Sequence, residues 1–126
     1  MLFRSASIFE AVAGKAIGYP EGTGGAVLQE TSKATGVTLN KPAGEITTDD
    51  AELAGAAEVS FVVTNSFVGL NDVPVVAVRS GASTGTYVAS VSAVAAGSFT
   101  ITLSNLGSTA SEILVLNYAI IKGAEA

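Results

Sequence analysis

The chain has 126 residues, with 6 Lys and Arg against 11 Asp and Glu, which gives a net charge of −5. This length is typical of a single domain. The sequence contains no Cys and no His, which excludes disulfides, thiolate nucleophiles and imidazole bases, and with them most zinc, haem and iron–sulfur sites. No segment gathers Lys and Arg into a patch, so nucleic acid is not an expected partner.

The charge content is unusually low. Charged residues make up 13% of the chain, about half the usual share, whereas 48% are apolar. This balance predicts a folded chain, because enough apolar surface is available to offset the loss of chain entropy. Between Arg79 and Lys122 the only charged residue is Glu112. Two interpretations stay open: a surface rich in Ser and Thr that faces solvent, or a surface that other subunits cover.

Residues 1–25 differ from the rest of the chain and predict an N-terminal arm. Residues 18–25 (GYPEGTGG) have the composition of a turn or linker. Residues 1–17 have the spacing of two or three helical turns with apolar side chains partly on one side: Leu2, Phe3, Ile8, Phe9 and Val12. An isolated helix this short is barely stable in water, so the arm, extended or partly helical, needs a support. That support is either its own domain, or a neighbouring subunit or larger surface onto which the arm docks.

Residues 26–126 have a hydrophobic period of two and predict one all-β domain. Turn-forming residues separate eight candidate strands: Ala26–Glu30, Gly36–Asn40, Gly44–Thr48, Glu58–Asn65, Val73–Ser80, Thr86–Val94, Ser98–Ser104 and Ile113–Lys122. About eight strands in a hundred residues favour an antiparallel β-sandwich.

The alternation assigns side chains to a core face. The core sets are Val59, Phe61 and Val63 in one strand, Tyr87, Ala89, Val91 and Ala93 in the next, and Phe99, Ile101 and Leu103 in the third. The last strand is apolar on both faces, so it is expected to be central in its sheet or pressed against another subunit.

Three connections carry specific signals. Residues 95–97 predict a β-hairpin in which Gly97 supplies the positive φ of a short loop. Pro74 predicts an edge strand or a strand start. Residues 49–53 (DDAEL) predict a capped helical turn or a tight loop that Gly55 ends.

The residue types for common active sites are missing. Only carboxylates remain as acid–base groups, and the acids Asp49, Asp50 and Glu52 lack the spacing of a calcium loop. Residues 14–16 lack the pattern of a phosphate-binding loop. The most apolar run, residues 113–121, is too short to cross a membrane as a helix. We therefore expect no catalytic, cofactor-binding or metal-binding residue, no cofactor, no membrane partner and no enzymatic activity.

Several segments between Thr31 and Gly123 resemble a small β-domain of tailed-bacteriophage structural proteins. The matching stretches are residues 31–41 (TSKATGVTLNK), 44–47 (GEIT), 59–61 (VSF), 64–66 (TNS), 85–87 (GTY), 97–103 (GSFTITL) and 111–122 (SEILVLNYAIIK). The resemblance covers about three-quarters of the chain, and its motifs are strand and turn patterns that mark no site. Residues 1–25 have no counterpart in it.

The resemblance implies a jelly-roll-like sandwich that acts as a capsid decoration, or cement, protein. Such a protein is made in the bacterial host cytoplasm, sits on the virion surface between capsomers, binds the major capsid protein and commonly forms a homotrimer. The alternatives are a tail or fibre domain with a receptor- or glycan-binding tip, in which Tyr19, Tyr87 or Tyr118 would face a sugar, and a bacterial enzyme subunit or carbohydrate-binding module. The partner interface is expected at Phe3, Ile8, Phe9, Tyr19 and Tyr118.

Overall fold

A computed structural model describes residues 13–126. Within these residues the chain forms eight strands and no helix, so the all-β prediction is confirmed. The strands are β1 (Gly25–Leu28), β2 (Val37–Thr38), β3 (Ala43–Thr47), β4 (Glu58–Thr64), β5 (Val73–Ser80), β6 (Tyr87–Ala95), β7 (Ser98–Asn105) and β8 (Val115–Ile121).

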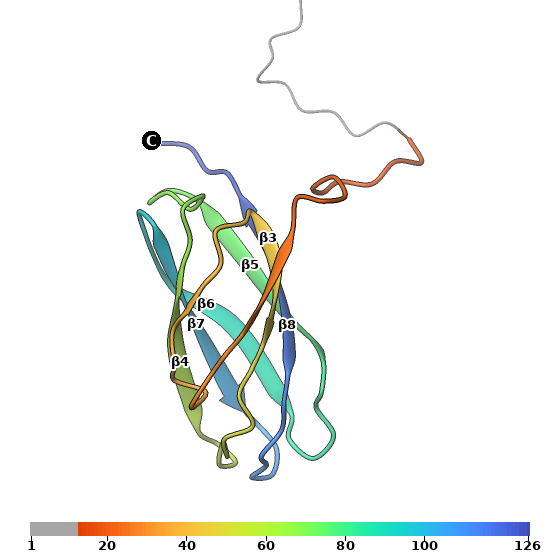
Figure 1. Ribbon diagram of the computed structural model, residues 1–126, viewed down its shortest axis with the longest axis vertical. Coiled ribbons are helices and arrows are strands. Elements are labelled where there is room, and N and C mark those ends of the chain that lie inside the picture. Colours follow the sequence, from red (N-terminus) through yellow and green to blue (C-terminus); the bar gives the residue numbers. More distant parts are fainter. Residues whose placement is uncertain (1–12) are drawn as a thin grey trace, which may run out of the picture.

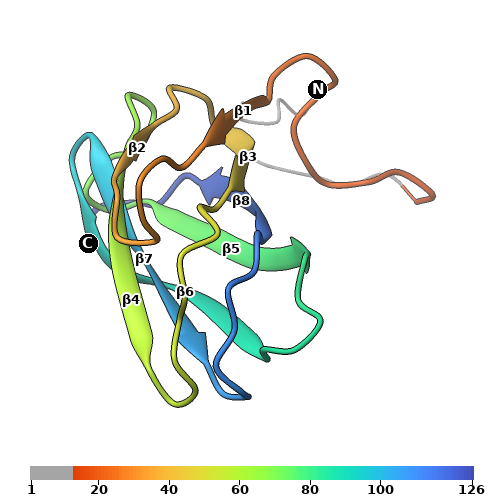
Figure 2. The same cartoon turned by 60° about the horizontal axis from the view of Figure 1, so that its bottom comes forward.

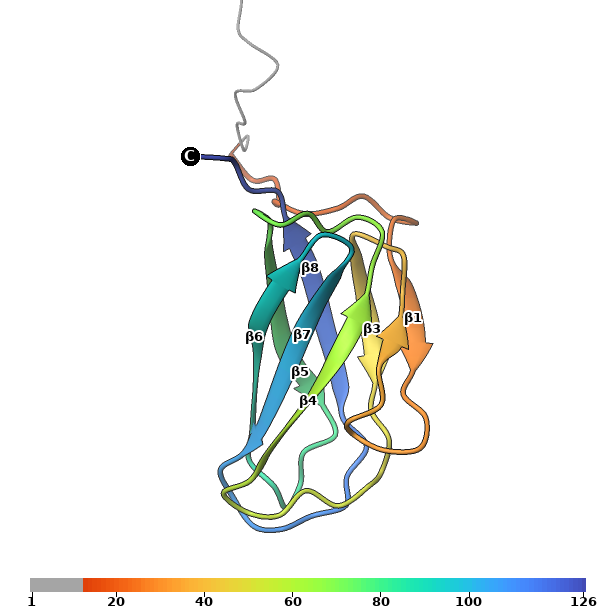
Figure 3. The same ribbon diagram turned by 90° about the vertical axis from the view of Figure 1, so that its left-hand side faces the viewer.

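The strands form two four-stranded layers that face each other (Figures 1 and 2). Sheet A has the order β1-β3-β8-β5, and sheet B has the order β2-β4-β7-β6. Figure 3 shows sheet B in front of sheet A. The expected purely antiparallel pairing is wrong in part, because β1 pairs with β3 and β2 with β4 in parallel. Both sheets are therefore mixed, and the jelly-roll-like topology stays a prediction.

Period-two alternation places the core between the sheets as expected. Phe61 and Phe99 are 2% and 1% exposed, and Ile101 and Leu103 are fully buried. Most of the large core side chains come from β7 and β8, each an inner strand of its sheet, and the other inner strands, β3 and β4, add Ile46 and Phe61. Each residue of these strands that points inward is apolar, with one exception: Asn105, which ends β7.

The predicted turns and edges also agree with the structure. β8 lies between β3 and β5, which confirms that it is central. β6 and β7 form the expected hairpin, in which Ala95 pairs with Ser98 and Gly97 has a φ of 85°. Pro74 lies near the start of β5, an edge strand, where a missing N–H costs least.

One local expectation needs correction, and at a second place the structure decides between two stated alternatives. The register of β6 against β7 shifts between Val91 and Ala93, so Ala93 is exposed and Val94 packs on the core instead. A β-bulge of this kind moves every later side chain to the opposite face. Residues 49–53 form a loop without a helical turn; Asp49 Oδ1 accepts the N–H of Ala51 at 2.7 Å, which fixes the loop locally.

The N-terminal arm is described from residue 13 onward. Residues 13–24 contain turns and no helix or strand, and they lie at the end of the sandwich where the C-terminus also lies (Figures 1 and 3). The expected helical turns fall mainly on residues 1–12, outside the described part of the chain. The first strand, β1, begins at Gly25. The division into an arm of residues 1–25 and a domain of residues 26–126 stays a prediction.

Candidate functional site

The two outer faces of the sandwich differ in chemistry, although both carry little charge. The outer face of sheet A consists of the residues that alternate away from the core: Ala26 and Leu28 in β1, Ala43, Glu45 and Thr47 in β3, Val115, Asn117, Ala119 and Ile121 in β8, and Val73, Val75, Ala77 and Arg79 in β5. Nine of these thirteen residues are Ala, Val, Leu or Ile. This face is therefore apolar over most of its area.

Large apolar side chains on this face are open to solvent. Leu28 is 70% exposed, Ile121 57%, Val73 52% and Val75 46%. Val73, Val75 and Ile121 are neighbours on β5 and β8, whereas Leu28 lies on the opposite edge strand, beyond Thr47 and Val115. Exposed apolar surface that is contiguous, as on β5 and β8, marks interaction sites in many proteins.

The two charges of this face neutralise each other. The Arg79 guanidinium reaches across β8 and donates a hydrogen bond to Glu45 Oε2 at 2.5 Å. Both side chains are well exposed, so the pair adds little stability. Its effect is to leave the face without net charge.

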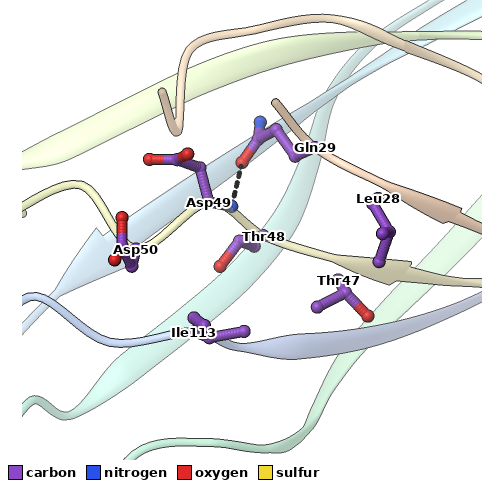
Figure 4. A pocket seen from close by; sticks show the side chains of 7 residues that line it. All are labelled: Leu28, Gln29, Thr47, Thr48, Asp49, Asp50 and Ile113. Carbon is purple, nitrogen blue, oxygen red and sulfur yellow. Dashed lines mark hydrogen bonds between the residues drawn. The ribbon is translucent and has the colours of Figure 1, made fainter. Parts of the chain in front are cut away.

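A shallow hollow of about 240 Å³ lies at one end of the outer face of sheet A (Figure 4). Leu28 and Ile113 form its apolar walls, and Asp49 and Asp50 lie beside them. Gln29 Oε1 accepts the N–H of Asp49 at 3.2 Å, which holds the acidic loop against β1 (Figure 4). The hollow continues the apolar surface beyond the strands.

The outer face of sheet B is rich in hydroxyl groups. Nine Ser and Thr side chains lie on it: Thr38, Ser60, Thr64, Ser90, Ser92, Ser98, Thr100, Thr102 and Ser104. Thr102 Oγ1 is 2.8 Å from Ser60 Oγ and donates to Ser92 Oγ at 2.8 Å, so the hydroxyls bond across three strands. Glu58 is the only charged residue on this face. Its hydroxyls can bond to water or to a polar partner at low desolvation cost.

A buried lysine fixes the loops at the end of the sandwich nearest the hollow. Lys33 is 3% exposed, and its Nζ donates to the carbonyls of Asp49, Ala51 (2.8 Å) and Glu112 (2.7 Å). Burial lowers the pKa of Lys33, and the neighbouring carboxylates oppose this shift. Lys33 therefore acts as a structural cross-link between three loops.

The Glu112 carboxylate fixes the loop between β5 and β6. It accepts the Ser83 hydroxyl at 2.6 Å and the N–H groups of Ser83, Thr84 and Gly85. The Ser83 hydroxyl and these N–H groups lower the pKa of Glu112 to about 2. Tyr87 also donates to Glu112 at 3.0 Å, and burial together with this carboxylate raises the pKa of Tyr87 to about 12.

Asp72 and two buried asparagines also hold loops in place through hydrogen bonds. The hydrogen bond from Lys122, with the N–H groups of Gly123 and Gly69, lowers the pKa of Asp72 to about 2. Asn65 and Asn105 are fully buried, and each side chain bonds to four or more backbone or hydroxyl partners. These polar groups maintain the fold and leave no unsatisfied side-chain atom facing a cleft among the described residues.

Only two of the expected interface residues lie in the described part of the chain. Phe3, Ile8 and Phe9 belong to residues 1–12 and lie outside it. Tyr19 is 42% exposed and donates its hydroxyl to the carbonyl of Ile120. The arm thus touches the end of β8, where Ile17 and Tyr19 flank a hollow on the outer face of sheet A.

Tyr118 lies in the core, which corrects its expected place on an exposed surface. It is 3% exposed, and its ring packs edge-to-face on Phe99 with centroids 5.4 Å apart. The opposite residue on β3 is Gly44, whose missing side chain leaves room for the ring. The Tyr118 hydroxyl donates to the Lys41 carbonyl at 2.8 Å, and burial raises the pKa of the phenol to about 12. Tyr118 is therefore not an exposed ring of the kind that the receptor- or glycan-binding alternative expects.

Sequence reasoning missed the apolar outer face of sheet A as a unit. The last strand, which is apolar on both sides, indicated part of it. The other contributors, Leu28, Val73 and Val75, come from strands whose neighbours in the sheet are distant in sequence. Their outward positions were readable from the alternation, but their convergence on one face was not.

Within residues 13–126, no three Asp or Glu side chains come close enough to hold a metal ion. The same residues include no helix with the length and hydropathy of a membrane span. Comparisons with protein-family models, curated proteins and solved structures found no match for this chain.

Proposed function

We propose that this chain is a non-enzymatic structural protein of a bacteriophage virion, and that it decorates the capsid by binding the major capsid protein between capsomers. The observation that carries the proposal is the near absence of charge on both outer faces of the sandwich: one internally neutralised pair on sheet A and Glu58 on sheet B. The proposal includes a jelly-roll-like topology, an extended or partly helical N-terminal arm of residues 1–25, and assembly with other copies of the chain.

The use of the ionisable groups supports a structural role. The carboxylates with lowered pKa, Asp72 and Glu112, are bonded to backbone N–H groups and hydroxyls that fix loops. A general acid needs a raised pKa and access to a substrate, and neither carboxylate has that environment. The work proposed for this chain is therefore mechanical.

Stabilisation would come from covering surface on neighbouring capsomers. Specific interfaces bury about 1,200–2,000 Å². Burial of the outer face of sheet A leaves no unpaired charge, and burial of the outer face of sheet B involves one carboxylate, that of Glu58, so few charges lose their contact with water. Repetition around a closed shell makes modest individual contacts strong together.

The test compares phage particles that contain this chain with particles from which it has been deleted. We expect the deleted particles to adsorb to cells normally but to release DNA at a lower temperature, measured by the fluorescence of a DNA-binding dye during heating. Adding the purified chain back should restore the original release temperature.

The opposite pattern favours the alternative role. Lost adsorption with unchanged heat resistance of the heads indicates a tail or fibre domain with a receptor- or glycan-binding tip. Unchanged adsorption together with unchanged heat resistance contradicts both roles.

A further inference from the structure

A hydrogen bond that sheet A cannot complete by itself holds the N-terminal arm against the sheet. The Ile120 N–H donates to the Pro42 carbonyl at 2.9 Å, so these two residues pair one position beyond Ala43 and Ala119. Such a pair in an antiparallel ladder exchanges two hydrogen bonds, but Pro42 has no N–H to donate in return. The Ile120 carbonyl therefore lacks its ladder donor, and the Tyr19 hydroxyl donates to it instead. This contact is an attachment point for the arm at the end of β8.

Beside this attachment point, the arm forms one wall of a groove over β5 and β8. Ile17 lines a hollow of about 350 Å³ together with Val75, Ala119 and Ile121. A second hollow, of about 260 Å³, shares Val75 and Ala119 with the first and extends to Ala77. These two hollows, which we call the β5–β8 groove, run from the arm onto the outer face of sheet A.

The β5–β8 groove is apolar and, in the part of the chain that the structure describes, open to solvent. Ile17 is 72% exposed, and Val75 and Ile121 are about half exposed. The one charged side chain in its described lining, Lys122, is already bonded to Asp72. A segment that fills this groove therefore needs apolar side chains and no net charge.

Residues 1–12 (MLFRSASIFEAV) have the composition and the length for this groove. Eight of these twelve residues are apolar, two of them Phe, and their one Arg and one Glu cancel in charge. The segment joins the described chain at residue 13, four positions before Ile17. Twelve residues span about 40 Å when extended and about 18 Å as a helix. Both lengths exceed the distance of about 13 Å along β5 from Val73 to Ala77.

We propose that the β5–β8 groove binds residues 1–12 of the same chain, which cover the exposed apolar side chains of β5 and β8. Burial of apolar side chains against Val75 and Ala119 supplies the driving force. The tether favours the chain's own segment over that of a second copy, because a short linker gives an effective concentration of about millimolar. This binding is a property of the isolated protein and does not depend on a role in the virion.

The first test uses the absence of tryptophan from the chain. Phe9→Trp places a single indole in the segment, and acrylamide quenching of its fluorescence measures its contact with solvent. The quenching constant of the full chain should be at least about twofold lower than that of a synthetic peptide of residues 1–12 with the same substitution. The constant should not change with protein concentration, because the contact lies within one chain.

A matched pair of valines locates the contact. Val75 in the groove and Val62 on the outer face of sheet B are both 46% exposed, and both point outward from a strand. In the chain with Phe9→Trp, Val75→Lys should raise the quenching constant at least about twofold, because binding of the segment would bury an ammonium group. Val62→Lys should leave the constant unchanged. Circular dichroism and urea unfolding verify that both variants fold; if Val75→Lys does not fold, Ile121→Lys replaces it.

Deletion of residues 1–12 gives an independent readout. The dye ANS binds exposed hydrophobic surface. Removal of eight apolar residues lowers dye binding if these residues lie in solvent, but raises it if they cover the groove. We expect dye fluorescence to rise at least about twofold in a deleted chain that keeps the circular dichroism spectrum of the full chain.

Four results would overturn the inference. They are quenching as strong as that of the peptide, equal responses to Val75→Lys and Val62→Lys, a deleted chain that binds no more dye than the full chain, and quenching that weakens as the protein concentration rises. The last result would show that the segment binds a second copy. None of these results bears on the heat resistance or adsorption of phage particles, so the virion role is tested separately.

Discussion

The Phe99 ring should contribute more to stability than any single outward-facing side chain of its strand. It is 1% exposed and packs against Tyr118 from the opposite sheet. Phe99→Ala removes a buried aromatic ring and leaves a cavity, which costs about 3–5 kcal/mol. The edge-to-face contact with Tyr118, in pairs of this kind about 0.5–1.5 kcal/mol, is part of that loss.

The assay is equilibrium unfolding in urea, followed by far-UV circular dichroism. With a slope near 1.5 kcal/mol/M, within the usual range of about 1–3, the midpoint should fall by about 2–3 M. Thr100→Ala, at the next position in β7 but on the outer face, is the control and should change stability by less than about 0.5 kcal/mol. A loss below about 1.5 kcal/mol for Phe99→Ala, with an unchanged slope, would refute the assignment of the β7 faces.

Four further predictions follow from the loops, the core and the arm. The pKa of Glu112 is about 2 in the folded chain, below its ordinary 4.5, so the ionised carboxylate stabilises the fold above about pH 4.5 and this contribution is lost as the pH falls towards 2. Between pH 7 and pH 3 the thermal midpoint should therefore fall less for Glu112→Gln than for the unmodified chain. Equal falls would count against the role of this carboxylate. Lys33→Met leaves three carbonyls without their donor and should cost about 2–4 kcal/mol in urea unfolding; no loss would mean that Lys33 is not a cross-link. Gly44→Ala places a Cβ 2.6 Å from Leu39 Cδ2 and 3.0 Å from the Tyr118 ring, so the thermal midpoint should drop by the equivalent of about 1–3 kcal/mol, and a stable variant would show that Tyr118 packs elsewhere. Deletion of residues 1–24 should leave cooperative unfolding intact, and a chain that no longer unfolds cooperatively would contradict the division into arm and sandwich.

The sequence was sufficient to predict where strands occur and which side chains point inward. Apolar alternation in residues 98–104 assigns the β7 core residues correctly, because a strand buried on one face must alternate. Gly97 and Pro74 mark a hairpin and an edge strand, because each residue restricts or frees the backbone in a specific way.

The sequence does not show which strands pair when they are distant along the chain. Periodicity says which face of a strand is buried but not which strand lies beside it, so the parallel pairs β1-β3 and β2-β4 were missed. The bulge near Ala93 has no composition signal, and it reversed the last residues of β6.

The place of the candidate interface was predicted only in general terms. The low charge of the second half of the chain indicated a surface that other subunits could cover. Tyr118 was wrongly placed on that surface, because a single sequence does not show that Gly44 lies opposite Tyr118 and leaves room for its ring in the core. Lys33, Asn65 and Asn105 look like surface residues in the sequence, and they are buried because loops that converge from several strands supply their hydrogen-bond partners.

The most direct measurement for the proposed function is an electron micrograph of purified phage particles in which this chain carries a gold-labelled C-terminal tag. The C-terminus is exposed at the end of the sandwich, so a tag there leaves both outer faces free (Figure 1). A decoration protein predicts regular labelling over the capsid and none on the tail. Labelling confined to the tail or its fibres, or particles without label, would contradict a role in capsid stabilisation.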